Sequence, residues 1–178
     1  MIATSNSLSD DSPIFLVGFM GAGKTTVGRA LARHLRYDFS DLDELIEKQA
    51  GKSIQAIFAE LGESGFRRIE REAIQSCSEM VRAVIALGGG AYVSAENRTS
   101  LRAIGKTVWL DCPLEVCLRR IGGDRSRPLL GDEAQMKTLL EQRSSAYEKA
   151  DYVVHAAELS PDELAAEIAE IVRTHLAE

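Results

Sequence analysis

Ile14-Phe15-Leu16-Val17, followed directly by Gly18-Phe19-Met20-Gly21-Ala22-Gly23-Lys24-Thr25, is the stretch of this sequence that decides the fold. Its first four residues are apolar and partly β-branched, which predicts a buried strand of a parallel sheet. From Lys24 to Leu35 the apolar residues recur at helical spacing, so we expect a helix there. The glycine-rich segment therefore connects a strand to a helix.

This glycine-rich segment matches the pattern G-x-x-x-x-G-K-[ST] at every defined position. Glycines allow such a loop to close around a polyphosphate with its N–H groups pointing inward, and the following helix N-terminus adds partial positive charge. We expect Lys24 to reach the β and γ phosphates of a nucleotide and the Thr25 hydroxyl to bind Mg²⁺. The expected nucleotide contacts are Gly21, Ala22, Gly23, Lys24, Thr25 and Thr26. An ordinary glycine turn before a helix is the alternative.

Strands and helices alternate along the rest of the chain. Further strands are expected at 37–40, 83–87, 107–110 and 152–154. Helices are expected at about 43–50, 63–81 and 95–104. Further helices are expected to start at Ser53 and at Pro113, and another to end at about Tyr147. The last helix should follow the capping box Ser160-Pro161-Asp162-Glu163. Parallel strands need crossover helices to join them. The sequence therefore predicts an α/β protein of three layers, with a five-stranded parallel sheet and helices on both faces.

Composition favours one domain, because 178 residues that are 45% hydrophobic suffice for a single core. We expect this domain to span 13–178 after a disordered tail at 1–12, which is rich in Ser and Asp. A net charge of -6 without a basic block argues against nucleic acid and anionic membranes as partners. The three cysteines fit neither a disulfide set nor a zinc site, and no apolar stretch could span a bilayer, so we expect a cytoplasmic protein.

Two classes of nucleotide-binding protein fit the sequence poorly. A GTPase is expected to carry an Asn-Lys-x-Asp motif, but the chain has only Asn6 and Asn97, and neither is followed by lysine. A motor ATPase is expected to end an apolar strand with an Asp that is linked to Mg²⁺, whereas the strand at 83–87 ends in glycines. Of these three classes of nucleotide-binding protein, a small-molecule kinase fits the sequence best.

From Phe15 through the last helix, the sequence resembles the shikimate kinases. Four motifs in this order carry the resemblance: Gly18 to Thr26; Asp41-x-Asp43; Phe66-Arg67-Arg68-Ile69-Glu70 with Leu87-Gly88-Gly89-Gly90-Ala91; and Arg127-Pro128-Leu129-Leu130 followed by Arg143. The resemblance implies a P-loop kinase fold and transfer of the γ-phosphoryl group of MgATP to the 3-hydroxyl of shikimate. ATP and shikimate are then the partners, Mg²⁺ is the metal, and the protein is expected to be a monomer.

The resemblance also implies roles for individual residues. Arg67 and Arg143 hold the substrate carboxylate as planar forks. Asp43 binds ring hydroxyls and is the candidate proton acceptor, which makes it catalytic together with Lys24 and Arg127. Asp41 assists Mg²⁺ alongside Thr25. Further substrate contacts come from Gly88, Gly89 and Gly90, and Arg120 lies near the adenine.

Arg127 falls in a glycine-flanked segment without apolar periodicity, which predicts a mobile lid at about 122–132. By resemblance, Arg127 swings over the phosphates and stabilises charge during transfer.

Several alternatives remain open at the level of the sequence. Asp41 and Asp43 could only cap the following helix, and the glycine triplet could be a plain turn. The arginines could be solvated surface charges. A gluconate kinase also uses a P-loop and a hydroxylated acid, and a nucleotide-binding regulatory module would have the loop without turnover.

Overall fold

The computed structural model describes residues 11–122 and 133–176, and for 175 and 176 the backbone alone. The strands of this described part are β1 (Ile14–Val17), β2 (Asp38–Asp41), β3 (Ala83–Ala86), β4 (Lys106–Asp111) and β5 (Tyr152–His155). The α-helices are α1 (Lys24–Leu35), α2 (Leu42–Ala50), α3 (Ile54–Ser76), α4 (Ala95–Ile104), α5 (Leu114–Gly122), α6 (Glu133–Tyr147) and α7 (Pro161–Leu176). Two short 3₁₀ helices are η1 (Cys77–Glu79) and η2 (Ala91–Val93).

The strands form one parallel sheet in the order β2-β3-β1-β4-β5. In the centre of the sheet, Phe15 of β1 is in register with Ile85 of β3 on one side and with Thr107 of β4 on the other. Every residue of β1 and β3 is buried, as expected for strands that are covered on both faces. Because all five strands run in the same direction, their carboxyl ends meet at one edge of the sheet.

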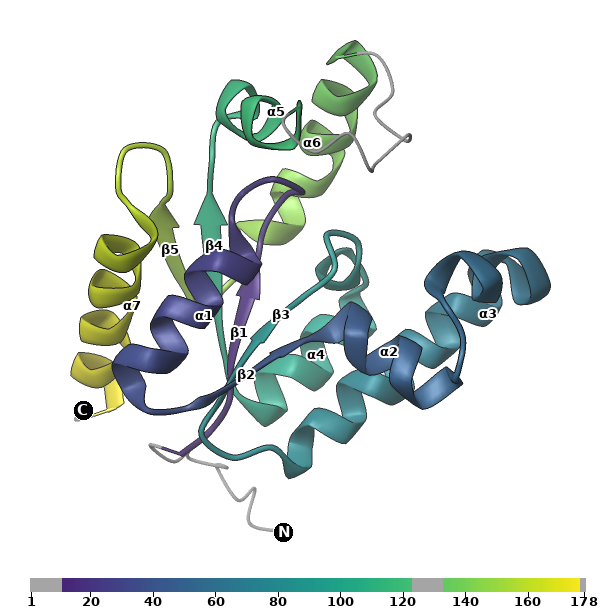
Figure 1. The fold of residues 1–178 in the computed structure, drawn as a ribbon, viewed down its shortest axis with the longest axis horizontal. Helices are drawn as coiled ribbons and strands as arrows, with labels where there is room; N and C mark the ends of the chain where they lie inside the picture. Colours follow the sequence, from purple (N-terminus) through teal and green to yellow (C-terminus); the bar gives the residue numbers. More distant parts are fainter. Residues whose placement is uncertain (1–10, 123–132, 177–178) are drawn as a thin grey trace, which may run out of the picture.

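Helices cover both faces of this sheet. Figure 1 shows α1 and α7 packed side by side on one face, with α4 and the second half of α3 on the other. The predicted three-layer α/β arrangement is therefore confirmed. The core is continuous from β1 to the apolar faces of α1 and α7, where Leu31 and Ile168 are fully buried.

Most element boundaries agree with the sequence prediction. The helix predicted at 63–81 is too long, because α3 ends at Ser76 and η1 follows it, and the other exceptions have local causes. β2 begins one residue later than predicted, because Arg36 turns into the left-handed region at φ 59° and the Tyr37 N–H bonds the carbonyl of Ala32 to close α1. Pro113 precedes α5 instead of opening it, and its carbonyl accepts from the N–H groups of Val116 and Cys117. Gly62 separates the two predicted helices as a kink within α3, with φ 66° and ψ -173°.

Near the C-terminus the predicted capping box is confirmed, and near the N-terminus the chain contacts the domain earlier than predicted. The capping box at the start of α7 forms, since the Ser160 N–H donates to Glu163 Oε2 at 2.8 Å and the Glu163 N–H to Ser160 Oγ at 3.3 Å. At the other end, the Asp11 carbonyl accepts from the Arg82 N–H at 2.7 Å, so Asp11 and Ser12 are placed against the domain. The rest of the predicted tail, 1–10, lies outside the described residues.

Two further expectations concern cysteines and membranes. Cys77, Cys112 and Cys117 are all buried free thiols. Among the residues placed by the structure, no helix has the length and apolarity needed to cross a bilayer.

We expect the substitution Gly105→Ala to lower the free energy of unfolding by about 1 to 3 kcal/mol. Gly105 has an extended backbone just before β4, and a Cβ there would overlap the carbonyl oxygen of Pro13, which accepts from the Lys106 N–H where β1 and β4 begin to pair. Denaturant unfolding measures the loss. Gly122→Ala is the matched control, since nothing lies within 4 Å of its added methyl group. Equal stability of the two variants would contradict the steric argument.

Candidate active site

The glycine-rich loop lies between the carboxyl end of β1 and the amino end of α1. Gly18, Gly21 and Gly23 have φ values of 143°, 77° and 97°, a region that other residues rarely adopt. Space is also lacking, because a Cβ on Gly21 would lie 2.6 Å from the Cys117 carbonyl oxygen. Gly23 caps α1 without a side-chain hydrogen bond, which leaves the first N–H groups of the helix to a ligand or solvent.

Lys24 folds back across this loop. Its Nζ donates to the carbonyl oxygens of Gly18 at 2.9 Å and Phe19 at 3.0 Å. Burial lowers the pKa of Lys24 to about 8, although the carboxylates of Asp43 and Asp41 act in the opposite direction. The ammonium group is thus charged at neutral pH but held in surroundings that disfavour its charge, and a bound anion would relieve this cost.

Thr25 and Asp41 bring two oxygen ligands together at the mouth of the loop. Thr25 Oγ1 donates to Asp41 Oδ2 at 3.1 Å, and the other carboxylate oxygen, Oδ1, accepts from the Asp43 N–H at 3.0 Å. Asp41 therefore caps α2 and faces Thr25 at the same time, so the two interpretations of this residue are compatible. A hydroxyl and one carboxylate suit Mg²⁺, which binds few protein oxygens and completes its shell with phosphates and water.

The glycine triplet at the end of β3 adjoins three predicted substrate residues. A Cβ on Gly88 would lie 2.8 Å from Asp43 Oδ1. A Cβ on Gly89 would lie 3.1 Å from Arg143 Nη1, and a Cβ on Gly90 would lie 3.1 Å from Arg67 Nη2. None of the three glycines has a positive φ. Their missing side chains therefore serve close approach, because each glycine leaves room for one charged side chain from another element.

Arg67 is positioned by a buried acid that the sequence analysis gave no role. Its Nη1 donates to both carboxylate oxygens of Glu70 at 3.0 Å, and Nη2 donates to Glu63 at 3.4 Å. Glu70 is buried and also accepts from Asn97 Nδ2 at 3.3 Å. The three-residue spacing of Arg67 and Glu70 could have indicated their contact, but nothing in the sequence pointed to Asn97.

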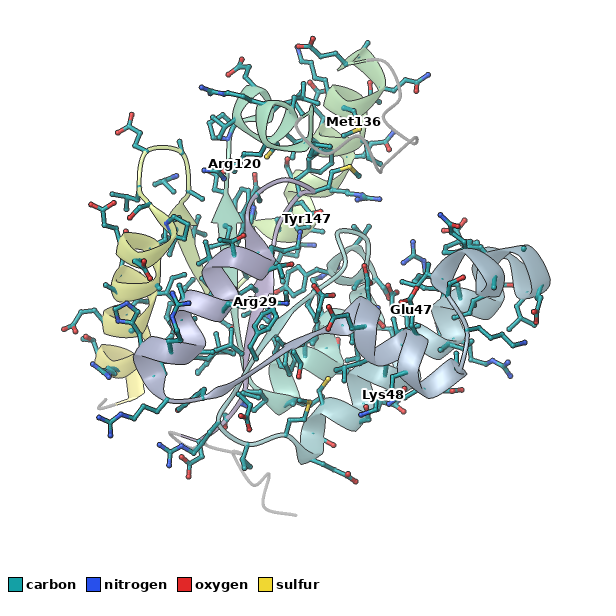
Figure 2. The ribbon with its side chains drawn as sticks, viewed as in Figure 1. Arg29, Glu47, Lys48, Arg120, Met136 and Tyr147 are labelled. Carbon is teal, nitrogen blue, oxygen red and sulfur yellow. The ribbon has the colours of Figure 1, made fainter. Side chains whose placement is uncertain are left out.

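Arg120 lies beside the glycine-rich loop, on the side of β4 and β5 (Figure 2). Its Nη1 donates to the Ala22 carbonyl and its Nη2 to the Ala156 carbonyl, both at 3.2 Å. These bonds use the edge of the guanidinium group and tie the loop to the segment after β5. Arg127, the predicted lid arginine, and the lid itself from residue 123 onward lie outside the described residues.

One cleft of about 550 Å³ contains most of these groups. It opens at the carboxyl edge of the sheet, where ligands of open parallel sheets bind. Its lining consists of Met20, Gly21, Gly23, Lys24, Thr25, Thr26, Asp41, Asp43, Leu87, Gly88, Gly89, Arg120, Ile121 and Arg143. Arg67 is not part of this lining but adjoins its rim through Gly90. The cleft therefore joins an anion-binding loop to a pocket that contains carboxylate and guanidinium groups.

This combination of fold and cleft defines a P-loop phosphotransferase. The family model described as shikimate kinase matches residues 20–173. The shikimate kinase of Geobacter sulfurreducens is 46% identical over 170 residues, which cover 94% of each chain, and that of Nostoc punctiforme is 42% identical over 171 residues, again 94% of each. The chain therefore belongs to the shikimate kinase family, whose members are ATP-dependent kinases that phosphorylate a hydroxyl group of shikimate in aromatic amino acid biosynthesis.

Solved structures agree with this assignment. A shikimate kinase from Acinetobacter baumannii in complex with shikimate superimposes with a TM-score of 0.86 at 37% identity, covering 96% of this chain and 97% of that one. The shikimate kinase of Aquifex aeolicus gives 0.81 at 39% identity, covering 92% and 97%. A sugar kinase from Janibacter sp. HTCC2649, at 16% identity and a TM-score of 0.62, shares the fold alone.

We expect nucleotide binding at about pH 9 to take up close to one proton from solution. With a pKa of about 8, Lys24 is mostly neutral at that pH in the free protein, and a bound polyphosphate favours its charged form. Calorimetric titration with a non-hydrolysable ATP analogue, in two buffers of different ionisation enthalpy, measures the uptake. Lys24→Arg is the control, because arginine stays charged. Equal proton uptake by both proteins, or none by the native protein, would show that Lys24 is not the group that takes up the proton.

Proposed function

We propose that this chain transfers the γ-phosphoryl group of MgATP in line to the 3-hydroxyl of shikimate, giving shikimate 3-phosphate and ADP without a covalent enzyme intermediate. The observation that carries the proposal is the convergence of Asp43, Arg67 and Arg143 on one glycine triplet, beside the phosphate loop. Such a site neutralises charge and positions two reactants, which is most of what phosphoryl transfer requires from a protein.

The acid end of the substrate is assigned to the two arginines. Their guanidinium groups lie against neighbouring residues of the triplet, Arg67 at Gly90 and Arg143 at Gly89. A guanidinium fork matches the geometry of a carboxylate and keeps its charge at any working pH. Because Arg67 is held by Glu70 through two hydrogen bonds, its side chain is ordered before substrate arrives.

The hydroxyl end of the substrate is assigned to Asp43. Its carboxylate lies against Gly88 and lines the same cleft as Lys24. In this position Asp43 can accept hydrogen bonds from ring hydroxyls and is the candidate for taking the proton of the attacking one. Lys24, which lines the same cleft, would neutralise charge on the transferred phosphoryl oxygens.

The nucleotide end is assigned to the loop and its neighbours. Phosphates would be bound by the N–H groups of Gly21, Ala22, Gly23, Lys24, Thr25 and Thr26. Thr25 and Asp41 would hold Mg²⁺, which supplies positive charge to the phosphates when it is bound. Arg120 would present the face of its guanidinium group to the adenine, since its edge already bonds two carbonyls. We further propose that Arg127 lies in a lid and that the protein is a cytoplasmic monomer. The buried free thiols support a reducing compartment.

The function is tested by offering the purified protein MgATP with either shikimate or gluconate and measuring ADP release. We expect turnover with shikimate and none with gluconate, because three charged groups on the triplet match a compact ring acid. Turnover with gluconate alone would replace the assignment with a gluconate kinase. ADP release with neither acid, in a protein that binds nucleotide, would support a regulatory module.

We expect Arg67→Lys to raise the KM for shikimate by about 10- to 100-fold with little change in the KM for ATP. Lysine keeps a positive charge beside the buried Glu70, so the fold is preserved, but it loses the planar fork. Arg68→Lys is the matched control, because Arg68 is exposed and adjacent in sequence. If both variants show the same KM for shikimate, Arg67 does not hold the carboxylate.

A further inference from the structure

Tyr147 is a fully buried side chain that neither the motifs nor the family resemblance singled out. It is the last residue of α6, and its hydroxyl donates to the carbonyl oxygen of Gly89 at 2.6 Å. Its ring lies against Trp109 of β4, with 6.0 Å between the ring centroids. Figure 2 labels Tyr147 near the end of α6. A side chain fixed by packing thus reaches the middle residue of the glycine triplet.

The bond to Gly89 constrains the next amide group. In a planar trans peptide, the carbonyl and the N–H point to opposite sides, and the described part of the chain contains no cis peptide bond. Holding the Gly89 carbonyl toward Tyr147 therefore directs the N–H of Gly90 away from it. Between two glycines this peptide would otherwise rotate with little steric resistance. The Tyr147 hydroxyl removes that freedom.

Tyr147 also shares a helix with a predicted substrate residue. Arg143 lies one turn earlier on α6, and its Nη1 adjoins Gly89. The Arg143 guanidinium group thus lies in the space that a side chain on Gly89 would need, and it also interacts with the Tyr147 phenol, whose hydroxyl is bonded to the Gly89 carbonyl. Burial raises the pKa of the Tyr147 phenol, which keeps the hydroxyl protonated and able to donate throughout the physiological pH range. One helix therefore positions both a guanidinium group and a backbone amide.

We infer that Tyr147 is a positioning residue for substrate binding: by holding the Gly89 carbonyl, it orients the Gly90 N–H as a donor to shikimate. This inference rests on the proposed function, in which the triplet binds the substrate. The tyrosine does not touch the substrate. Its effect should appear in shikimate binding and leave nucleotide binding unchanged, because the Gly21 to Thr26 amides belong to the glycine-rich loop and the start of α1.

Tyr147→Phe tests the inference, with Tyr92→Phe as a matched control. Tyr92 is also buried, and its hydroxyl donates to the carbonyl of Lys149 at 3.1 Å, so both substitutions delete one buried phenol hydroxyl. We expect Tyr147→Phe to weaken shikimate binding about five- to tenfold and to raise its KM equally. The KM for ATP should stay within about twofold. Tyr92→Phe should leave both KM values unchanged.

Steady-state kinetics gives the two KM values, and calorimetric titration with shikimate measures its binding directly. Replacing Tyr147 with 4-aminophenylalanine keeps a donor at the same ring position and should restore binding, which separates orientation of the peptide from general loss of stability.

Three outcomes would overturn the inference: an unchanged KM for shikimate in Tyr147→Phe, equal increases in both tyrosine variants, or no rescue by the amino analogue. None of these affects the proposed function if the native protein turns over shikimate. A native protein that fails to phosphorylate shikimate would instead refute the function itself.

Discussion

The close approach of backbone to charged side chains at the carboxyl ends of β1 and β3 is the constraint on which this site depends. After β1, three left-handed glycines curve the loop, and a side chain on Gly21 would collide with the carbonyl of Cys117. After β3, three glycines leave room for Asp43, Arg143 and Arg67. The two strands are neighbours in the sheet, so the two glycine segments lie side by side. A methyl group on any glycine of the triplet would crowd a charged side chain of the site, and one on Gly18 or Gly21 would collide with a backbone carbonyl.

Charge in the cleft follows from this crowding. Lys24 is half-buried between the loop carbonyls and two carboxylates, and its pKa falls because desolvation outweighs those partners. Arg67 has a buried carboxylate as its partner, and Glu70 in turn is bonded by Asn97. Each cation is thus held by protein groups before a ligand arrives, at a cost in stability that a bound polyphosphate or carboxylate can offset. Preorganised charge is what a phosphotransferase uses to stabilise its transition state.

The elements with strong local signals could be predicted from the sequence. The glycine-rich loop, helices α1 and α4 and the capping box of α7 agree with the structure because their signals lie within a few neighbouring residues. β2 was placed one residue early, since its start depends on how α1 ends at Arg36. In the site, the residues indicated by the family resemblance lie close together wherever the structure describes them. Nothing in the sequence indicated Tyr147 or Asn97. Both act through hydrogen bonds to distant segments, which leave no local pattern.

By itself, the sequence determined the alternation of strands and helices, the phosphate loop and the family to which the chain belongs. These depend on residue types at short spacings, because such spacings determine the local backbone preference and the hydrophobic periodicity. Only the tertiary structure decided which face of the glycine triplet meets Arg143 and which carbonyl Tyr147 holds. Those contacts join residues 58 positions apart in the case of Tyr147 and Gly89. They exist because α6 packs against η2, which directly follows the triplet, and packing between distant segments is fixed by the whole core.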